Sequence, residues 1–465
     1  MTPERDALID TWTRTLASRA HDAAIYDTRG EVLRSFGDIE AEARGFCDAE
    51  LAGLDAGGVL AIQLGNHPAW PALLLACLAR RIVVLPLERS MAENERNLAL
   101  ETCHAAALAT SGSQLDGVKI ARRESNAVDW GLRPPTLLKL TSGTTAAPRA
   151  IRFQSHQLLA DCEQICDTMG ITSADLNFAV IPVSHSYGFS NLLTPLIARG
   201  VPIALSNDRM PRAVLDDLAT AGATVFPGMP VFYQAFCGIA DPPELPRLRL
   251  CVSAGAPLSL PVAQEFRAKF GHAIHSFYGS SECGGICYDR EARLVEQGFV
   301  GEPMNGVTLE LLEPAIDTTQ VRVRSAAAAD GYFPQPDEEK LGRGSFTPDD
   351  LLARTAAGFK IAGRLSDVIN VAGKKVNPAE VEAALLKFAG VREATVFGLQ
   401  SALRNEEVAA CVVADDGVRE RDVLEFCRAE LSGWQVPKRL FFVETMPVNE
   451  RGKISRRGLA QCFGT

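Results

Sequence analysis

The chain has 465 residues, which is too long for one small hydrophobic core and fits two or more domains. Hydrophobic residues make up 47% of it and charged residues 22%, an ordinary globular balance, and the net charge is −10. This acidity argues against a general nucleic-acid-binding protein, which would need a basic face to meet phosphates.

The sequence gives no sign of export or of membrane insertion. Residues 1–19 mix charges with short apolar runs, and no run of 18 apolar residues occurs in the sequence. The 12 cysteines form no Cys-x-x-Cys pair and no Cys/His cluster at zinc spacing. We therefore expect a cytoplasmic protein with reduced thiols.

Short apolar segments alternate with helical ones through most of the chain. Segments bounded by Gly, Asn, Asp or Pro predict buried strands, and longer segments between them predict helices. The expected strands lie at 59–64, 82–87, 176–181 and 201–205, and the expected helices at 70–79 and 212–221. Such alternation predicts parallel β-sheets covered by helices.

A small α+β unit is expected from residue 364 onward. Its expected strands lie at 367–371, 374–376, 391–397, 408–413 and 440–443, and a helix at 423–431. Asn377-Pro378-Ala379-Glu380 predicts another helix start, because Asn caps, Pro suits the first helical position and Glu can reach back to the cap. The fold class is therefore α/β, with a large N-terminal domain of helix-covered sheets at 1–363 and a small C-terminal domain at 364–465.

The most informative stretch is Leu140-Thr-Ser-Gly-Thr-Thr-Ala-Ala-Pro-Arg149. Its hydroxyl side chains and backbone N–H groups can turn toward phosphate oxygens, while the arginine adds positive charge. It is not a Walker loop, since Gly-x4-Gly-Lys-Ser/Thr is absent, and a solvated Ser/Thr turn is the alternative. The expected phosphate contacts are Thr141, Ser142, Gly143, Thr144, Thr145 and Arg149.

Six further segments accompany this loop in the sequence. They are the Pro-x-x-His-x-x-Gly segment at 182–188, Tyr-Gly-Ser-Ser-Glu at 278–282, Gly-Glu-Pro at 301–303, Phe-Thr-Pro-Asp at 346–349, the segment from Gly363-Arg364 to Glu382, and Pro-x4-Gly-Lys-x2-Arg at 447–456. Together, and in this order, they resemble the adenylate-forming superfamily of AMP-binding enzymes, which includes acyl-CoA synthetases, peptide-synthetase adenylation domains and firefly luciferases. The resemblance covers roughly residues 30 to 460.

The resemblance implies a ligase that uses ATP and Mg²⁺ to activate a small-molecule carboxylic acid, either fatty or aromatic, as an acyl-adenylate. The acyl group would then pass to coenzyme A, and the phosphopantetheine of an acyl or aryl carrier protein is the alternative acceptor. In the family, the small C-terminal domain rotates between these two steps, about a hinge that corresponds to Ser366 here. The chain ends eight residues after Arg457, so we expect no carrier domain fused behind it.

The resemblance also assigns nucleotide and metal contacts. Glu282 would hold Mg²⁺ together with the phosphates, and an exposed loop Glu is the alternative. Asp349 would accept hydrogen bonds from both ribose hydroxyls, with the adjacent Asp350 as a one-residue alternative. Tyr278 would either stack on adenine or pack in the core. The remaining contacts would be Gly279, Ser280, Ser281 and Arg364.

Lys453 is expected to be the principal catalytic residue, and a solvated basic tail is the alternative. In the family this lysine contacts the substrate carboxylate and the α-phosphate, where an ammonium stabilises the transition state. His185 would line and gate the acyl pocket, or else pack in the core. The expected acyl pocket consists of His185, Ser186, Phe226, Gly255 and Phe277, and the expected thiol tunnel of Gly373 and Lys375.

Several alternatives stay open at this point. An ATPase or kinase should carry a Walker or kinase motif, which the sequence lacks, and a mere nucleotide-binding module should lack Glu282 or Lys453. A luciferase-like oxygenase is a further alternative within the family. Ser186 stands near the place where amino-acid-activating relatives carry Asp, which argues against an amino acid substrate. The sequence does not separate an aliphatic acid from an aromatic one.

Overall fold

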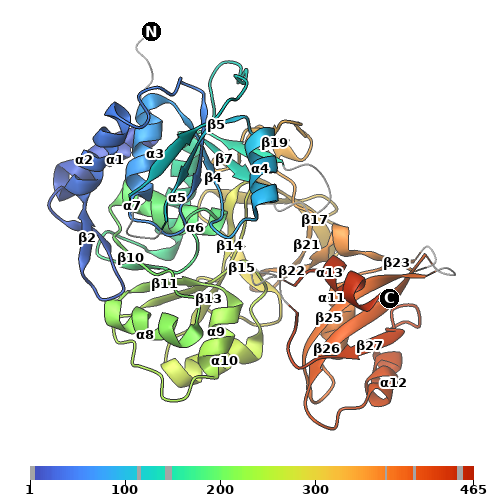
Figure 1. Cartoon of the computed structure of the whole chain (residues 1–465). Helices are drawn as coiled ribbons and strands as arrows, with labels where there is room; N and C mark the ends of the chain where they lie inside the picture. The colour runs from blue at the N-terminus through green and yellow to red at the C-terminus, as the bar shows by residue number, and fades with distance from the viewer. Residues whose placement is uncertain are drawn as a thin grey trace. The chain divides into compact units, whose positions relative to one another are not determined.

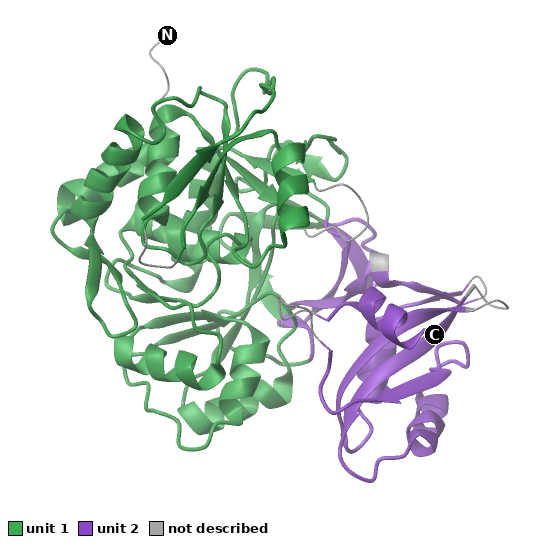
Figure 2. Cartoon of the chain, in the orientation of Figure 1, with its two compact units in different colours: residues 1–296, 300–310, 322–347 green, residues 297–299, 311–321, 348–465 purple. Residues whose placement is uncertain are grey.

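The computed structural model describes residues 6–112, 117–141, 149–371, 374–401, 405–447 and 454–464 (Figure 1). The chain divides into two compact units (Figure 2). Unit 1 comprises 1–296, 300–310 and 322–347, and unit 2 comprises 297–299, 311–321 and 348–465. The α/β fold class is confirmed, whereas the boundary expected at 363/364 refers to a hinge and stays a prediction.

Unit 1 and the segments that join it to unit 2 contain most of the helices and strands. The helices are α1 Ala7–Arg19, α2 Phe36–Asp48, α3 Trp70–Arg80, α4 Glu93–Thr102, α5 Ser155–Met169, α6 Ser186–Gly188, the π-helix η1 Phe189–Leu193, α7 Thr194–Arg199, α8 Pro211–Ala221, α9 Pro230–Cys237 and α10 Leu260–Phe270. The strands are β1 Ala23–Tyr26, β2 Val32–Ser35, β3 Val59–Gln63, β4 Val83–Pro86, β5 Ala105–Thr110, β6 Lys119–Arg122, β7 Leu137–Leu140, β8 Ala150–Phe153, β9 Asn177–Ala179, β10 Ile203–Leu205, β11 Val225–Gly228, β12 Leu250–Ser253, β13 Ile274–Ser280, β14 Gly284–Tyr288, β15 Phe299–Pro303, β16 Val307–Leu311, β17 Thr318–Ser325, β18 Gly331–Phe333, β19 Leu341–Gly342 and β20 Ser345–Phe346.

One sheet of unit 1 has the strand order β18-β8-β7-β4-β3-β5-β6. Its centre is parallel, while β8 pairs antiparallel with β7 and opposes Ala150 to Leu140. Strands β3 and β4 are buried at every position, which explains their unbroken apolar sequences. The antiparallel β7–β8 pair brings both ends of the expected phosphate loop to one edge of this sheet.

A second set of strands runs β2-β1-β10-β9-β11-β12-β13-β14, and its pairs from β1 to β13 are parallel. Helices α8, α9 and α10 gather on one side of β11 and β13 (Figure 1). In parallel strands the carboxyl ends meet at the same edge, and here Gly228, Ser253 and Ser276 lie in register across β11, β12 and β13. The strands and helices expected in this part of the chain are confirmed, with strands shorter than the apolar runs.

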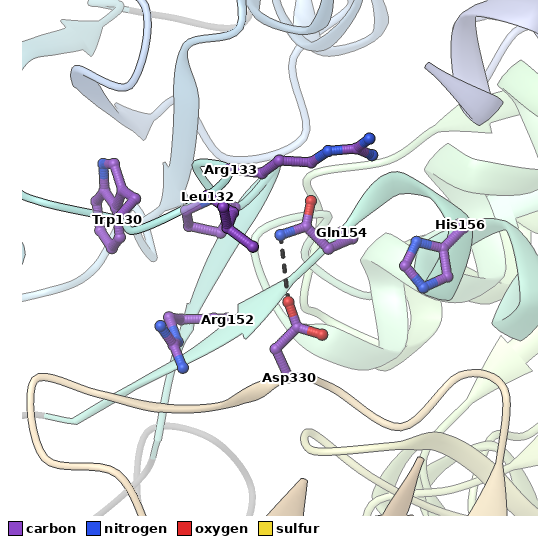
Figure 3. A pocket seen from close by; sticks show the side chains of 8 residues that line it. Trp130, Leu132, Arg133, Arg152, Gln154, His156 and Asp330 are labelled. Carbon is purple, nitrogen blue, oxygen red and sulfur yellow. Dashed lines mark hydrogen bonds between the residues drawn. The ribbon is translucent and has the colours of Figure 1, made fainter. Parts of the chain in front are cut away.

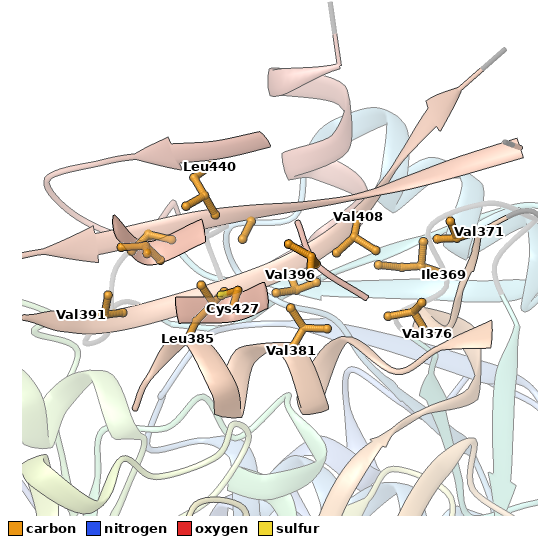
Figure 4. Packing of buried hydrophobic residues seen from close by; sticks show 14 residues of the cluster. Ile369, Val371, Val376, Val381, Leu385, Val391, Val396, Val408, Cys427 and Leu440 are labelled. Atoms are coloured by element: carbon orange, nitrogen blue, oxygen red, sulfur yellow. The ribbon is translucent and has the colours of Figure 1, made fainter. Parts of the chain in front are cut away.

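The largest segment of unit 2, residues 348–465, begins with a hairpin and continues with a separate sheet. Its elements are β21 Asp350–Thr355, β22 Gly358–Arg364, the 3₁₀ turn η2 Leu365–Asp367, β23 Ile369–Val371, β24 Lys374–Val376, α11 Pro378–Leu385, β25 Val391–Ser401, β26 Asn405–Ala414, α12 Glu420–Glu430, β27 Arg439–Phe442 and α13 Arg456–Phe463. The sheet order is β24-β23-β26-β25, with β27 parallel to β26. Figure 4 shows Val381 and Leu385 of α11 packing with Val396 and Val408 of the sheet.

Two expectations for unit 2 need correction. Strand β23 starts at residue 369 rather than 367, because η2 takes up the preceding residues. Asn377 does cap α11, and its side chain accepts from the Ala379 N–H at 3.1 Å. The carboxylate of Glu380, however, accepts from Gln435 Nε2 at 2.9 Å, so a partner distant in sequence takes the place of the expected reach to the cap.

Arg456 fastens α13 to the rest of unit 2. Its guanidinium donates to Asp367 Oδ2 at 2.6 Å, to Glu382 Oε1 at 2.8 Å and to the carbonyl oxygen of Val396 at 2.9 Å. Removing one partner of a buried ion pair leaves the remaining charges uncompensated.

We therefore expect Arg456→Met to lower the free energy of unfolding of unit 2 by about 2–3 kcal/mol, less than for a fully buried pair because this side chain is partly exposed. Urea unfolding, followed by hydrogen exchange of the backbone amides of β25 and β26 in unit 2, measures the change. Arg457→Met at the exposed neighbouring position is the control. Equal midpoints for both variants would show that the ion pairs of Arg456 contribute nothing to stability.

Candidate active site

The phosphate loop is a closed connection between β7 and β8. The Thr141 N–H donates to the Arg149 carbonyl oxygen at 2.8 Å, directly beyond the last paired residues of the two strands. Thr141 and Arg149 thus lie side by side at the base of the loop. Residues Ser142, Gly143, Thr144 and Thr145 lie outside the described residues, as do Gly373 and Lys453.

Arg149 is held by β18, the neighbouring strand of β8. Its guanidinium carbon lies 4.1 Å from the centre of the Tyr332 ring, and its Nη2 donates to the Gln335 carbonyl oxygen at 3.2 Å. Strand pairing sets Tyr332 opposite Ile151, two residues beyond Arg149. A cation over an aromatic face is attracted by the ring quadrupole, so Tyr332 fixes the cation at the loop base.

Glu282 sits in the turn between β13 and β14. The Ser280 hydroxyl accepts from the N–H groups of Glu282 and Cys283 at 3.2 and 3.3 Å, which shapes the turn. The Tyr332 hydroxyl donates to Glu282 Oε1 at 3.2 Å. Glu282 is partly buried, so the alternative of an exposed loop glutamate is wrong.

Tyr332 therefore joins the cation of the phosphate loop to the carboxylate of Glu282. Desolvation raises the pKa of Glu282 above its ordinary value, against the lowering effect of hydrogen bonds from its own N–H, Tyr332 and Ser280. Burial likewise raises the pKa of Tyr332, which keeps its hydroxyl a proton donor. Our reading of the sequence missed Tyr332, since nothing in its neighbourhood resembles a binding motif.

The segments around His185 and Glu282 meet through two hydroxyl groups. Ser186 Oγ donates to Ser281 Oγ at 2.9 Å. His185 caps α6, and its Nδ1 accepts from the Tyr187 N–H at 3.2 Å, so the neutral ring carries its proton on Nε2. His185 and Ser186 thus lie beside the Tyr-Gly-Ser-Ser-Glu turn, while the gating role of His185 stays a prediction.

The other expected acyl-pocket residues differ in their surroundings. The Phe277 ring packs 5.8 Å from the Tyr187 ring, and Phe277 and Tyr278 are 8% and 7% exposed. Phe226 is fully buried among aromatic rings, including Tyr233 at 5.6 Å. Gly255 follows β12 with φ +85°, a conformation that favours glycine. Tyr278 is thus packed against protein, and its stacking on adenine stays a prediction.

The residues of unit 2 that we expect to bind ribose or the thiol lie in or next to the β21–β22 hairpin and on β24. Asp350 opposes Arg364 across β21 and β22, and Arg364 Nε lies 3.4 Å from Asp350 Oδ1. The Leu365 N–H donates to the Asp349 carbonyl oxygen at 2.8 Å. Lys375 is exposed on β24 opposite Asn370. These contacts place Asp349 next to Arg364, and the ribose and thiol-tunnel roles stay predictions.

A surface hollow of about 420 Å³ lies on unit 1 beside β8 (Figure 3). Its lining residues are Trp130, Leu132, Arg133, Pro135, Arg152, Gln154, His156 and Asp330. Gln154 Nε2 donates to Asp330 Oδ2 at 3.2 Å across it (Figure 3). Among the described residues, none of those expected in the active site lines this hollow.

The described residues could bind Mg²⁺ only together with the phosphates of a nucleotide. Among them, no group of three or more His, Cys, Asp or Glu side chains could hold a metal ion. A single carboxylate suits Mg²⁺ that keeps water and phosphate oxygens as its other ligands. Glu282 is the carboxylate that the turn presents beside the phosphate-loop cation.

A hydroxyl-rich loop closed by two paired strands, with a cation and a carboxylate joined by Tyr332, defines a nucleotide-binding α/β protein. Residues 131–333 match the model of the AMP-binding enzyme family, and residues 380–453 match its C-terminal domain. The two matches span more than half of the chain. The chain belongs to the AMP-binding enzymes, as the order of its motifs predicted.

Curated relatives align with most of the chain. A feruloyl-CoA synthase from Amycolatopsis is 27% identical over 447 residues, covering 89% of this chain and 90% of that protein. An Arabidopsis thaliana oxalate–CoA ligase is 25% identical and also covers 89% of this chain and 90% of its own length. A 4-hydroxybenzoate/benzoate–CoA ligase from Rhodopseudomonas palustris is 29% identical over 68% of this chain and 62% of its own length.

Solved structures share the fold. The ATP-bound crystal structure of MatB from Rhodopseudomonas palustris superimposes with a TM-score of 0.84 at 23% identity and covers 98% of both chains. In the part of the chain that the structure describes, no helix combines the length and apolar character needed to cross a bilayer.

Proposed function

We propose that this chain is an ATP-dependent acid–CoA ligase. It joins a small carboxylic acid to the α-phosphate of ATP, releases pyrophosphate, and passes the acyl group of the adenylate to coenzyme A. The observation that carries the proposal is the Arg149–Tyr332–Glu282 arrangement at the base of the phosphate loop. The full-length curated relatives support coenzyme A as acceptor over a carrier protein, because they are CoA synthases or ligases.

The chemical obstacle is repulsion between the carboxylate of the acid and the phosphates of ATP. Arg149, fixed over the Tyr332 ring, supplies positive charge at the loop base. Lys453 contributes a second cation at the reacting groups, where it stabilises the charge that moves to pyrophosphate. Glu282 holds the Mg²⁺ that screens the phosphates when it is bound. His185, Ser186 and Phe277 border the acid.

The free thiols of the cysteine side chains support a cytoplasmic location for the protein. All 12 are free thiols, and those other than Cys47 and Cys462 are buried. Burial raises the pKa of several of them, for example of Cys237 to about 11, so these thiols stay protonated and unreactive. Such a set suits a reducing compartment.

The proposal predicts AMP and pyrophosphate as products, with an absolute need for Mg²⁺. The decisive assay is acid-dependent exchange of labelled pyrophosphate into ATP, run with aliphatic, aromatic and amino acids. The acid with the strongest exchange is then offered with coenzyme A or with a phosphopantetheine-bearing carrier protein. Formation of ADP and phosphate would refute the ligase assignment, and thioester on the carrier protein alone would replace the acceptor.

A further inference from the structure

A buried asparagine side chain bridges the sheet that carries the phosphate loop and the second set of strands. Asn66 follows β3 of the first sheet and is 4% exposed. Its Nδ2 donates to the carbonyl oxygens of Ala179 at 2.7 Å, of Ile181 at 3.3 Å and of Ser206 at 3.2 Å. These acceptors end or follow β9 and β10 of the second set. The bridge therefore lies at the carboxyl ends of strands from both sheets, which is the edge where α/β proteins bind ligands.

The same side chain holds the first residues of the Pro-x-x-His-x-x-Gly segment. Asn66 Oδ1 accepts from the Val183 N–H at 2.9 Å. Strand β9 ends at Ala179, so the buried backbone groups beyond it need partners other than those of a strand ladder. One amide group supplies them, since it bonds to the carbonyl oxygen of Ile181 and to the Val183 N–H. Asn66 thus fixes the backbone on both sides of Pro182.

The Pro-x-x-His-x-x-Gly segment folds into one compact turn. The His185 N–H donates to the Pro182 carbonyl oxygen at 3.0 Å, and a Cβ on Gly188 would come within 2.1 Å of the same oxygen. At the far end of the turn, Ser186 Oγ donates to Ser281 Oγ at 2.9 Å. Because packing this close leaves the turn little room to bend, its placement depends on its anchors. The asparagine anchors its start, and the serine pair anchors its other end.

We propose that Asn66 is a positioning residue for the acid, which holds His185 and Ser186 in place relative to the phosphate loop. The inference rests on the proposed function, in which these two residues border the acid. The carboxylate of the acid must meet the α-phosphate of ATP, and the groups that bind the two substrates follow strands of different sheets. A displacement of about 1 Å can slow a reaction about 10²-fold, even when the altered residue lies far from the chemistry. Asn66 acts on this alignment through the backbone that it holds.

This role predicts that Asn66→Ala affects the two substrates differently. The variant loses all four hydrogen bonds of the side chain, so kcat/KM for the acid should fall about 10²-fold. The affinity for MgATP should stay unchanged, because the phosphate loop and Glu282 make no part of these bonds. Pyrophosphate exchange at varied acid concentration measures the first quantity, and calorimetric titration of the full chain with MgATP measures the second. Hydrogen exchange of the backbone amides at 180–188 should become faster in the variant.

A second buried amide provides the matched control. Gln164 is 8% exposed, and its Nε2 donates to Ser325 Oγ at 3.1 Å, which joins α5 to β17. Gln164→Ala therefore also removes a buried hydrogen bond between distant parts of unit 1 and should lower the melting temperature. It should leave kcat/KM for the acid and the hydrogen exchange at 180–188 unchanged.

Unchanged kcat/KM for the acid in a folded Asn66→Ala would overturn the inference, and so would an equal loss of MgATP affinity. If Asn66→Ala does not fold, Asn66→Ser takes its place, since its shorter side chain cannot reach all four partners, and the same two results would overturn the inference. If the unmodified protein exchanges no pyrophosphate with any acid, the proposed function itself fails. Hydrogen exchange then still tests the anchor, because equal exchange at 180–188 in the unmodified protein and the variant would show that Asn66 does not hold the turn.

Discussion

Replacing Lys453 with alanine is expected to separate the two half-reactions of the enzyme. Lys453 precedes Arg456 by three residues, and Arg456 is bonded to Asp367 and Glu382. The chain just beyond Lys453 is therefore anchored to unit 2. If unit 2 rotates between the half-reactions, as the family resemblance implies, it carries Lys453 to the reacting groups for only one of them.

Formation of the acyl-adenylate should slow by about 10² to 10³, the scale for one lost transition-state donor. Conversion of a synthetic acyl-adenylate to the thioester should proceed at nearly the normal rate, because the ammonium contributes nothing to that step. Both rates are measured on one preparation of Lys453→Ala, with folding checked by circular dichroism. Arg457→Ala, which removes an exposed cation nearby, is the control. Equal losses in both half-reactions would point to a structural role for Lys453.

Most of the fold was predictable because the residues within each strand already indicate a strand. β3 and β4 are buried on both faces, so each reads as a short apolar run between turn residues. The start of α11 was predictable from the sequence because Asn377 and Pro378 act on the backbone next to them. The error at Glu380 has the opposite cause, since Gln435 competes for its carboxylate from 55 residues away.

A residue of the candidate site was predictable only where it lies in the same segment of the chain as the sequence motif that indicates its role. Glu282 and the loop base at Thr141 and Arg149 belong to such segments. Tyr332 does not, because it meets the Glu282 turn only after strand pairing brings distant parts of the chain together.

Replacing Glu282 with glutamine should impair metal use while sparing stability. Glutamine keeps the shape and an oxygen that can accept from Tyr332, but it removes the negative charge. Loss of a residue that supports a metal ligand costs 10- to 100-fold, so losing the ligand itself should slow adenylate formation at least about 100-fold at limiting Mg²⁺. A rise in Mg²⁺ concentration should recover part of this rate.

The thermal stability of Glu282→Gln should not fall with its activity. Desolvation raises the pKa of Glu282 above 4.5, so the folded protein binds this proton more tightly than the unfolded chain. The contribution of Glu282 to the stability of the folded protein is therefore fully present below pH 4.5. This contribution is lost as the pH rises through the pKa of Glu282 in the folded protein. Without metal or nucleotide, Glu282→Gln should then melt at or above the temperature of the unmodified protein at neutral pH, and the difference should shrink toward pH 4.5.

Two control variants separate the charge of Glu282 from its surroundings. Glu291→Gln removes an exposed carboxylate and should alter neither the Mg²⁺ dependence nor the melting temperature. Tyr332→Phe leaves the carboxylate but removes its donor, so its Mg²⁺ dependence should shift less than that of Glu282→Gln. An unchanged Mg²⁺ dependence in Glu282→Gln would remove this carboxylate from the metal site. A large drop in its melting temperature would instead mean that the turn between β13 and β14 needs the charge to fold.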